Sequence, residues 1–324
     1  MKILNLLLIA ASLLSVTSAS QEPPELKEAA TLTASVVKLA DEEKYDEALP
    51  LAKRALQIRE KLLPPTDQRV AEAWNNLGEI YIGKVDYEAA KKAFEQVIEL
   101  HEKRVGPEGP DLAPAFDRLA PLYFRTRSYA KAENAYKRAI AIREKALGNH
   151  QQVARSLFAI AEFYRVRREF EPAMDHYQRS LKLYKQVSGT KTAEFDRARE
   201  GFSCLSYAKP ELAAEMQEVW KEFTDPEQQT VPEPGTILNG RALSLPKPDY
   251  PDAARQLRLA GSVVVLVTID ETGKVIKARD MCQGPQYLSQ SSVAAALKAR
   301  FTPTKLSGMP VIVNGIIQYN FVPR

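Results

Sequence analysis

The 324-residue chain has few of the residues that carry most enzyme chemistry. It contains three histidines and two cysteines, and neither residue type clusters at the spacing of a metal site or a nucleophile with its base. A glycine-rich phosphate loop and a nucleophile elbow are also missing. The sequence therefore predicts a protein that is not an enzyme and that needs neither a cofactor nor a metal.

The histidines are His101, His150 and His176, and they fall in predicted helices or in loops between them. Because no second histidine or cysteine lies at ligand spacing, we expect each to be a surface residue. The chain also lacks a stripe of basic and aromatic residues, although its pI is near 8.8. This absence argues against a nucleic-acid partner.

Long apolar runs are missing after the first 20 residues, and the composition of 45% hydrophobic and 27% charged residues is that of a globular protein. The start differs: Lys2 precedes an apolar run over 3–14, and the small residues Thr17 and Ala19 follow. This layout favours a cleaved signal peptide at 1–20 over a short retained membrane anchor. We therefore expect an exported protein, and inner-membrane anchoring remains the alternative.

The two cysteines, Cys204 and Cys282, lie far apart in what we interpret as different domains. Two buried free thiols are the interpretation that this separation favours. A disulfide that clamps the two domains is the alternative, and an oxidising compartment would permit it.

Four copies of one unit occupy the first two thirds of the chain. An aromatic residue recurs at Tyr45, Tyr87, Tyr129 and Phe170, with spacings of 42, 42 and 41 residues. An alanine recurs three residues later in each copy, and each copy contains two stretches with helical periodicity. This pattern resembles the tetratricopeptide repeat in the 42-residue form of kinesin light chains.

The resemblance implies an all-α superhelix over 25–224. Two further helices, predicted at 192–207 and 211–223, would cap it. Proline and glycine then accumulate in a polar stretch without periodicity, so 225–240 is predicted to be a linker. The remaining residues, 241–324, form a second domain.

Period-2 patterning begins after Gly261. It predicts strands at 263–269 and 275–281 and a last strand at 311–321. Between them it predicts a helix at 291–301, with Val293, Leu297 and Phe301 on its buried side and a serine cluster at its start that could act as an N-cap. With an earlier helix before Gly261, this makes a small α+β domain with a three-stranded sheet and two helices. The expected fold is thus multidomain, a helical superhelix followed by an α+β module.

The order of several short motifs in 241–323 resembles the C-terminal domain of the energy transducer TonB. They include Arg241-Ala242-Leu243-Ser244, Tyr250-Pro251, Gly273 and the Phe301-Thr302-Pro303 step. In that family the last strand is an open sheet edge, to which a segment of an outer-membrane receptor, the TonB box, adds as a further strand. The segment before Tyr-Pro is the family's second receptor contact.

The resemblance implies a receptor-peptide site made of two segments. These are Lys247, Pro248, Asp249, Tyr250 and Pro251, and then Val311, Ile312, Val313, Asn314, Gly315, Ile316, Ile317, Gln318, Tyr319, Asn320 and Phe321. The chain departs from the family elsewhere, because residues 1–30 contain no histidine to couple to proton-channel subunits and the long Pro-rich spacer is replaced by repeats.

Tetratricopeptide superhelices bind peptides on the surface lined by the first helix of each repeat. The residues predicted to face this repeat groove are Glu72, Asn75, Glu79, Asp117, Phe124, Arg155, Phe158, Glu162 and Arg165. Two functions remain open. One is a TonB-like periplasmic protein that engages outer-membrane receptors for transport of substrates such as siderophores. The other is a periplasmic scaffold that is not energised and binds proteins through both domains.

Overall fold

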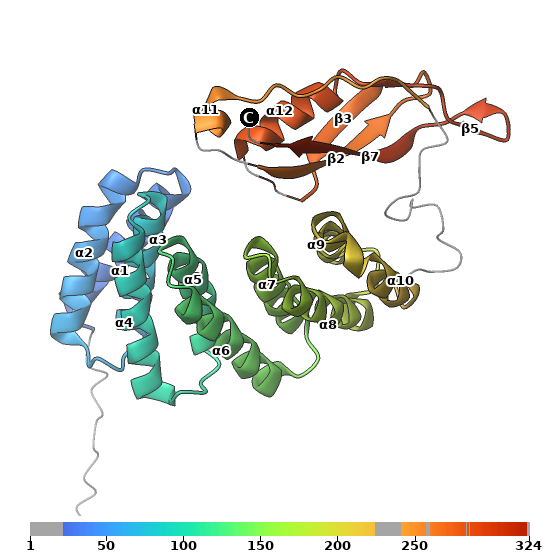
Figure 1. Ribbon diagram of the computed structural model, residues 1–324. Coiled ribbons are helices and arrows are strands. Elements are labelled where there is room, and N and C mark those ends of the chain that lie inside the picture. Colours follow the sequence, from blue (N-terminus) through green and yellow to red (C-terminus); the bar gives the residue numbers. More distant parts are fainter. Residues whose placement is uncertain (1–21, 224–240, 257–259, 283, 285, 323–324) are drawn as a thin grey trace, which may run out of the picture. The chain divides into compact units, whose positions relative to one another are not determined.

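The computed structural model describes residues 22–223, 241–256, 260–282, 284 and 286–322 (Figure 1). The predicted signal or anchor at 1–20 and the predicted linker at 225–240 lie outside these residues. By its contacts the chain divides into two compact units, Met1–Gly106 and Pro107–Arg324.

The first unit consists of two helix pairs. They are α1 (Pro24–Asp41) with α2 (Tyr45–Leu62), and α3 (Gln68–Gly83) with α4 (Tyr87–Val105). Small residues make the close crossings, because a Cβ added to Gly78 would stand 2.6 Å from the ring of Phe94. The fully buried Ala48 and Ala90 stand at the same position of successive repeats. The spacing of small residues in the sequence is therefore the spacing of helix contacts.

Each of the four repeats turns between its two helices through a residue with positive φ that is not glycine. These residues are Glu43 (58°), Val85 (61°), Arg127 (58°) and Arg168 (64°). They keep the repeat spacing and stand two residues before the recurring aromatic. Left-handed backbone is unfavourable for residues with a Cβ, so every repeat carries a small amount of local strain.

The second unit begins with four more repeat helices and the cap. The repeat helices are α5 (Leu112–Arg125), α6 (Tyr129–Leu147), α7 (Gln151–Val166) and α8 (Phe170–Ser188), and the cap is α9 (Ala193–Ala208), η1 (Pro210–Leu212) and α10 (Ala213–Lys221). Aromatic residues join the cap to the last repeat, since the Tyr177 and Phe202 ring centroids are 6.4 Å apart and Trp220 lies 5.2 Å from Phe202. The predicted cap helices are present.

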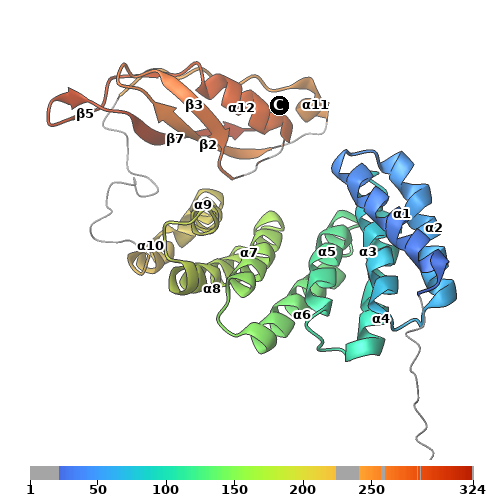
Figure 2. The ribbon, with the colours of Figure 1, turned by 180° about the vertical axis from the view of Figure 1, so that it is seen from behind.

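The C-terminal module is built on an antiparallel sheet with the strand order β3-β2-β7. Its helices are α11 (Asp252–Gln256) and α12 (Gln286–Ala296), and its strands are β1 (Ala242–Ser244), β2 (Gly261–Ile269), β3 (Val275–Asp280), β4 (Arg300–Phe301), β5 (Lys305–Leu306), β6 (Met309–Pro310) and β7 (Val313–Phe321). Seen from either side in Figures 1 and 2, α12 lies along the sheet. Alternate residues of β2 and β7 face this helix and form the module's core.

The predicted helix at 291–301 is wrong at both ends. The helix runs over Gln286–Ala296, Phe301 belongs to β4, and Leu297 is 43% exposed instead of buried. The serine cluster that we interpreted as an N-cap lies inside the helix, where Ser292 Oγ donates to the carbonyl of Leu288 at 2.8 Å. The buried side consists instead of Leu288 and small alanines, which allow the helix to approach the sheet closely.

Candidate functional site

β7 is an edge strand, because within the described residues it pairs with β2 on one side only. The register decides which of its backbone groups remain open. The amide of Met281 donates to the carbonyl of Val264 at 2.8 Å, so the backbone N–H and C=O groups of Val264 point toward β3. The backbone groups of its neighbours Val263 and Val265 therefore point toward β7.

This alternation runs along the whole ladder. Val263 faces Tyr319 and Val265 faces Ile317, so these β7 residues bond to β2. The residues between them direct their N–H and C=O groups to the open edge, and they are Asn314, Ile316, Gln318 and Asn320. Unsatisfied backbone groups on an edge strand are a template for a further strand.

Side-chain contacts agree with this register. Thr268 Oγ1 donates to Asn314 Oδ1 at 2.9 Å, and Ser262 Oγ donates to Asn320 Oδ1 at 2.5 Å. Both pairs stand directly opposite one another on the exposed face. In an antiparallel ladder, opposite side chains approach most closely where the two residues do not exchange backbone hydrogen bonds. The short contacts therefore agree with a register in which the backbone N–H and C=O groups of Asn314 and Asn320 face the open edge.

The second predicted segment, 247–251, meets the end of this strand. The rings of Tyr250 and Phe321 are 6.0 Å apart, and the carbonyl of Asp249 accepts a 2.5 Å hydrogen bond from Ser291 Oγ of α12. Arg255 covers the Tyr250 ring at 5.9 Å. Tyr250 is thus part of the packing, while Lys247 and Asp249 are exposed.

A short hairpin, β5–β6, precedes β7 and was not predicted from the sequence. Ser307 (φ 51°) and Gly308 (φ 86°) form its two-residue turn, and Leu306 and Met309 beside the turn are each 69% exposed. Ser-Gly between two short strands is the signal that could have identified it. The hairpin adds two apolar side chains beside the N-terminal end of the edge strand.

Comparison with family models assigns both parts of the chain. The model described as "Gram-negative bacterial TonB protein C-terminal" matches residues 246–323, and the tetratricopeptide-repeat model matches 29–103, 69–145 and 111–186. The chain is a tetratricopeptide-repeat protein that ends in a TonB C-terminal domain. Both are families of non-catalytic protein-interaction domains, so the chain has a protein-interaction role and protein partners.

Solved structures share the repeat fold. The nearly identical TPR-like repeats of a kinesin light chain from Podosopora anserina align with 16% identity and a TM-score of 0.53, over 61% of this chain and 94% of that one. BtubC (BKLC) from P. vanneervenii aligns with 14% identity and a TM-score of 0.52, over 65% of this chain and 89% of that one. None of the curated proteins matches the chain significantly.

The residues predicted for the repeat groove lie on three helices, and several are already engaged within the fold. On α3, Glu72 is exposed and Asn75 and Glu79 are half-buried. On α5, both Asp117 carboxylate oxygens are held by Arg143, and Phe124 packs against other rings.

On α7, Arg155 is exposed, whereas the Phe158 ring lies 6.0 Å from that of Tyr177. Glu162 and Arg165 complete the set and bind one another. α3 belongs to the first unit and the other two helices to the second. Most of these residues therefore have a structural role, and Glu72 and Arg155 are the most exposed polar ones.

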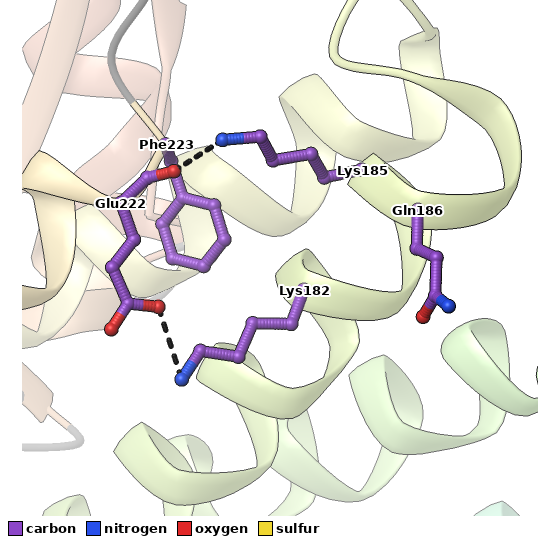
Figure 3. Close-up of a pocket in the computed structure, with 5 residues that line it drawn as sticks. All are labelled: Lys182, Lys185, Gln186, Glu222 and Phe223. Carbon is purple, nitrogen blue, oxygen red and sulfur yellow. Dashed lines mark hydrogen bonds and ion pairs between the residues drawn. The ribbon is translucent and has the colours of Figure 1, made fainter.

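A shallow hollow of about 450 Å³ lies between α8 and the end of α10 (Figure 3). Its two lysines point toward Glu222: Lys182 forms a 3.0 Å ion pair with the carboxylate, and Lys185 donates to the backbone carbonyl at 2.5 Å. Because both cations are already paired, this hollow offers little chemistry for a ligand.

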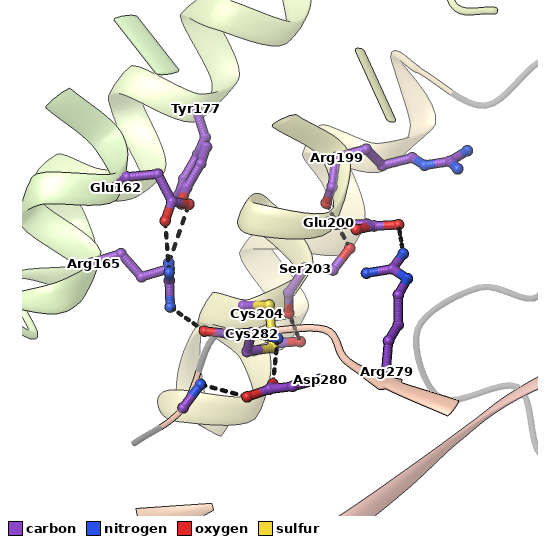
Figure 4. Close-up of a disulfide and its surroundings, with 12 residues drawn as sticks. Glu162, Arg165, Tyr177, Arg199, Glu200, Ser203, Cys204, Arg279, Asp280 and Cys282 are labelled. Carbon is purple, nitrogen blue, oxygen red and sulfur yellow. Dashed lines mark hydrogen bonds and ion pairs between the residues drawn. A yellow bond between two sulfur atoms is a disulfide. The ribbon is translucent and has the colours of Figure 1, made fainter. Parts of the chain in front are cut away.

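The Glu162–Arg165 pair is part of a larger network (Figure 4). Arg165 Nη2 lies 2.6 Å from Glu162 Oε2, Tyr177 OH donates to the same carboxylate, and Arg165 Nη1 donates to the carbonyl of Cys282 at 2.8 Å. Burial acts to lower the pKa of Arg165, but the hydrogen bond and charge of Glu162 outweigh it and raise that pKa. Burial, followed by the Glu162 charge, raises the pKa of Tyr177. The network is therefore a fixed Arg⁺–Glu⁻ pair with a neutral phenol.

Cys204 and Cys282 form a disulfide, with their Cα atoms 5.6 Å apart (Figure 4). The preferred prediction of two free thiols is therefore wrong. The prediction relied on the sequence separation of 78 residues, but the fold brings the two side chains together. Cys204 is buried in α9 at 3% exposure. Cys282 lies two residues after the end of β3, the second strand of the β2–β3 hairpin.

The histidines do not form a site. His150 is exposed and caps α7, but His176 is not a surface residue as predicted: its side chain is 14% exposed and stacks on Tyr164. No group of three or more metal-ligating side chains occurs in the part of the chain that the structure describes. Among the described helices, none combines the length and apolar character that crossing a bilayer requires.

Proposed function

We propose that the chain is a TonB-like periplasmic protein whose module accepts an extended segment of an outer-membrane receptor as a fourth strand on β7. One observation carries this proposal: four consecutive alternate residues of β7 direct their backbone groups to an open edge. A strand bound there gains main-chain hydrogen bonds along about eight residues, a mode of recognition that depends little on side chains.

The neighbouring surfaces suit an extended ligand. The exposed face beside the edge is polar, through Asn314, Gln318 and Asn320, and it matches a solvated strand. The apolar Leu306 and Met309 stand before one end of β7, and Tyr250 packs at the other. In this proposal the repeats serve as a docking platform or spacer, and the protein acts by binding without catalysis.

The test uses the full chain and synthetic peptides that carry TonB boxes from receptors of the same cell. Gln318→Pro removes an N–H that faces the open edge, whereas Gln318→Ala removes the side chain and keeps that N–H. We expect Gln318→Pro to weaken peptide binding by about tenfold or more, the effect of losing one well-formed hydrogen bond, and Gln318→Ala to change it little.

Controls on both partners make the result specific. Circular dichroism of Gln318→Pro must show an intact fold. A second control uses two versions of the peptide, one N-methylated on its odd residues and one on its even residues. Only the version whose methylated amides face β7 should lose binding. Equal losses in Gln318→Pro and Gln318→Ala would contradict strand addition. No binding at millimolar peptide would exclude the receptor function.

A second function is a periplasmic scaffold that is not energised. It is favoured by residues 1–30, which contain no histidine, and by repeats in place of the family's Pro-rich spacer. The two proposals predict different effects of the proton-motive force in the cell. If the chain is an energised receptor partner, collapse of that force should abolish the receptor-dependent uptake that needs this chain. If the chain is a scaffold, it should bind its partners equally well with and without that force.

A further inference from the structure

Three contacts join the TonB C-terminal module to the end of the repeats. The disulfide links Cys204 of α9 to Cys282, Arg165 of α7 donates to the Cys282 carbonyl at 2.8 Å, and Arg279 of β3 is paired with Glu200 of α9. All three fall within the second compact unit. They converge on the short stretch 279–282, the end of the β3 hairpin.

A buried residue on the outer face of the sheet, Val264 of β2, also indicates contact between the module and the end of the repeats. Val264 is on the face opposite α12 and is absent from the module's core, yet it is 2% exposed. Its neighbours on that face are more open, since Ser262 is exposed and Leu266 half-buried. α9 contacts β2, so the cap of the repeats covers the outer face around Val264.

The contact is otherwise polar. A cavity of about 240 Å³ between α7, α9 and β3 is lined mainly by charged residues of both signs, which are Glu162, Arg165, Arg197, Glu200, Arg279 and Asp280. The ion pair that joins the two parts, Arg279–Glu200, contributes little to stability, since the Arg279 side chain is 51% exposed. Because the residues around this cavity are mainly charged, we expect the contact to be weak without a covalent bond, which makes the disulfide the element that decides whether it persists.

We propose that the Cys204–Cys282 disulfide is a redox latch that holds the C-terminal module on the α7–α9 end of the repeats. While it is closed, the carbonyl of Cys282 occupies Arg165, and this end of the repeat groove is closed to other ligands. When it opens, the module separates and Arg165 becomes available to the backbone of a peptide from another protein. This inference does not rest on strand addition to β7.

The opening reaction is a thiol–disulfide exchange with a protein dithiol. A thiolate of the reductant attacks the sulfur of Cys282, the more exposed of the two cysteines, and Cys204 leaves as a thiolate that takes up a proton. The second thiol of the reductant then attacks the mixed disulfide and releases Cys282. The chain gains two electrons and two protons, and the reductant becomes a disulfide.

Hydroxyl-radical footprinting of the full chain tests the latch, because two methionines provide the signal and its control. Met281 lines the cavity at the contact, whereas Met309 stands 69% exposed on the β5–β6 hairpin. In the oxidised chain we expect slow oxidation of Met281 and fast oxidation of Met309. In a Cys204→Ser/Cys282→Ser double variant the Met281 rate should rise several-fold and the Met309 rate should not change.

Wild-type protein reduced with dithiothreitol should behave as the double variant does, and two thiols should become alkylatable. Adding Arg165→Ala to the double variant should leave the Met281 rate at its raised value, because the contact is already lost. Two results would overturn the proposal: a Met281 rate that stays slow in the double variant, or one that already equals that of Met309 in the oxidised chain.

Discussion

Arg143 of α6 holds both carboxylate oxygens of Asp117 on α5, with Nη1–Oδ1 at 3.0 Å and Nη2–Oδ2 at 2.5 Å. The same Nη1 lies 2.6 Å from Ser156 Oγ on α7, so one side chain joins three successive helices. Arg59 stands at the same position two repeats earlier, in the first unit, where it donates to the carbonyl of Arg69 on α3 and to Thr33 Oγ1 on α1. A buried arginine that is hydrogen-bonded to the two neighbouring helices, here called a helix tie, thus recurs in the repeats.

Replacing this tie should destabilise the repeats. Arg143→Met keeps the volume but leaves Asp117 and Ser156 without their donor. We expect a loss of about 2 kcal/mol in unfolding free energy, less than for a fully buried pair because the Asp117 side chain is 33% exposed. Lys145→Met is the control, since Lys145 and Glu108 are each 68% exposed and such pairs contribute little. Urea unfolding followed by circular dichroism measures both, and equal effects would contradict the assignment.

Glycine should stabilise the turn inside the second repeat. Val85 has φ of 61° and is 64% exposed, so its side chain contributes strain and little packing. Val85→Gly should raise the unfolding free energy by about 1 kcal/mol. Val85→Ala retains a Cβ and should give a smaller gain. The thermal midpoints of the two variants provide the comparison, and a lower midpoint for Val85→Gly would refute the strain argument.

Two glycines of the module should respond differently to alanine. Gly273 (φ 85°) and Gly308 (φ 86°) share a left-handed backbone, but a Cβ on Gly273 would overlap the carbonyl oxygen of Phe301, whereas Gly308 has no heavy atom within 4 Å of that position. Gly308→Ala should cost about 1–2 kcal/mol of conformational strain. Gly273→Ala adds a clash with backbone and should disrupt the module, visible as lost dispersion of its amide resonances.

Acid should destabilise the fourth repeat through His176. Burial lowers the pKa of this histidine below 6.5, with the nearby charges of Arg179 and Lys137 acting in the same direction and those of Asp175 and Glu133 against it. Between the lowered folded pKa and 6.5 the unfolded chain binds more protons than the folded one. The stability that neutral His176 provides is therefore complete above pH 6.5 and declines as the pH falls toward the folded pKa.

The variant His176→Gln should show a flatter fall in unfolding free energy between pH 7.5 and 5.5 than the wild type. His150→Asn is a suitable control, because asparagine retains an acceptor for the Gln152 amide at the start of α7. This control should keep the wild-type slope. An unchanged slope in His176→Gln would show that other groups account for the pH dependence.

Much of the fold could be predicted because it depends on local pattern. The recurring aromatic and alanine positions defined the repeat helices, and the alternation from Val313 to Phe321 assigned the two faces of β7. Helical and period-2 patterning after residue 241 also gave the order of the module's main helices and strands. The resemblance to TonB supplied the edge position of β7, which the alternation of a single strand does not reveal.

The remaining features depend on contacts between distant residues or on very short segments. The strands β1 and β4 contain three and two residues, too few for a period to be recognised. Which amides of β7 face outward follows from its register with β2, a pairing between segments that lie far apart in the sequence. The burial of His176 and the pairing of Cys204 with Cys282 are likewise set by packing between elements.

The cysteine count also bears on how the protein matures. Two cysteines allow one intramolecular disulfide, so oxidation of a single chain has no wrong pairing to correct. Maturation then requires an oxidant for the thiols but no isomerase. The competing product is a dimer cross-linked between two chains, and its yield rises with the protein concentration during oxidation.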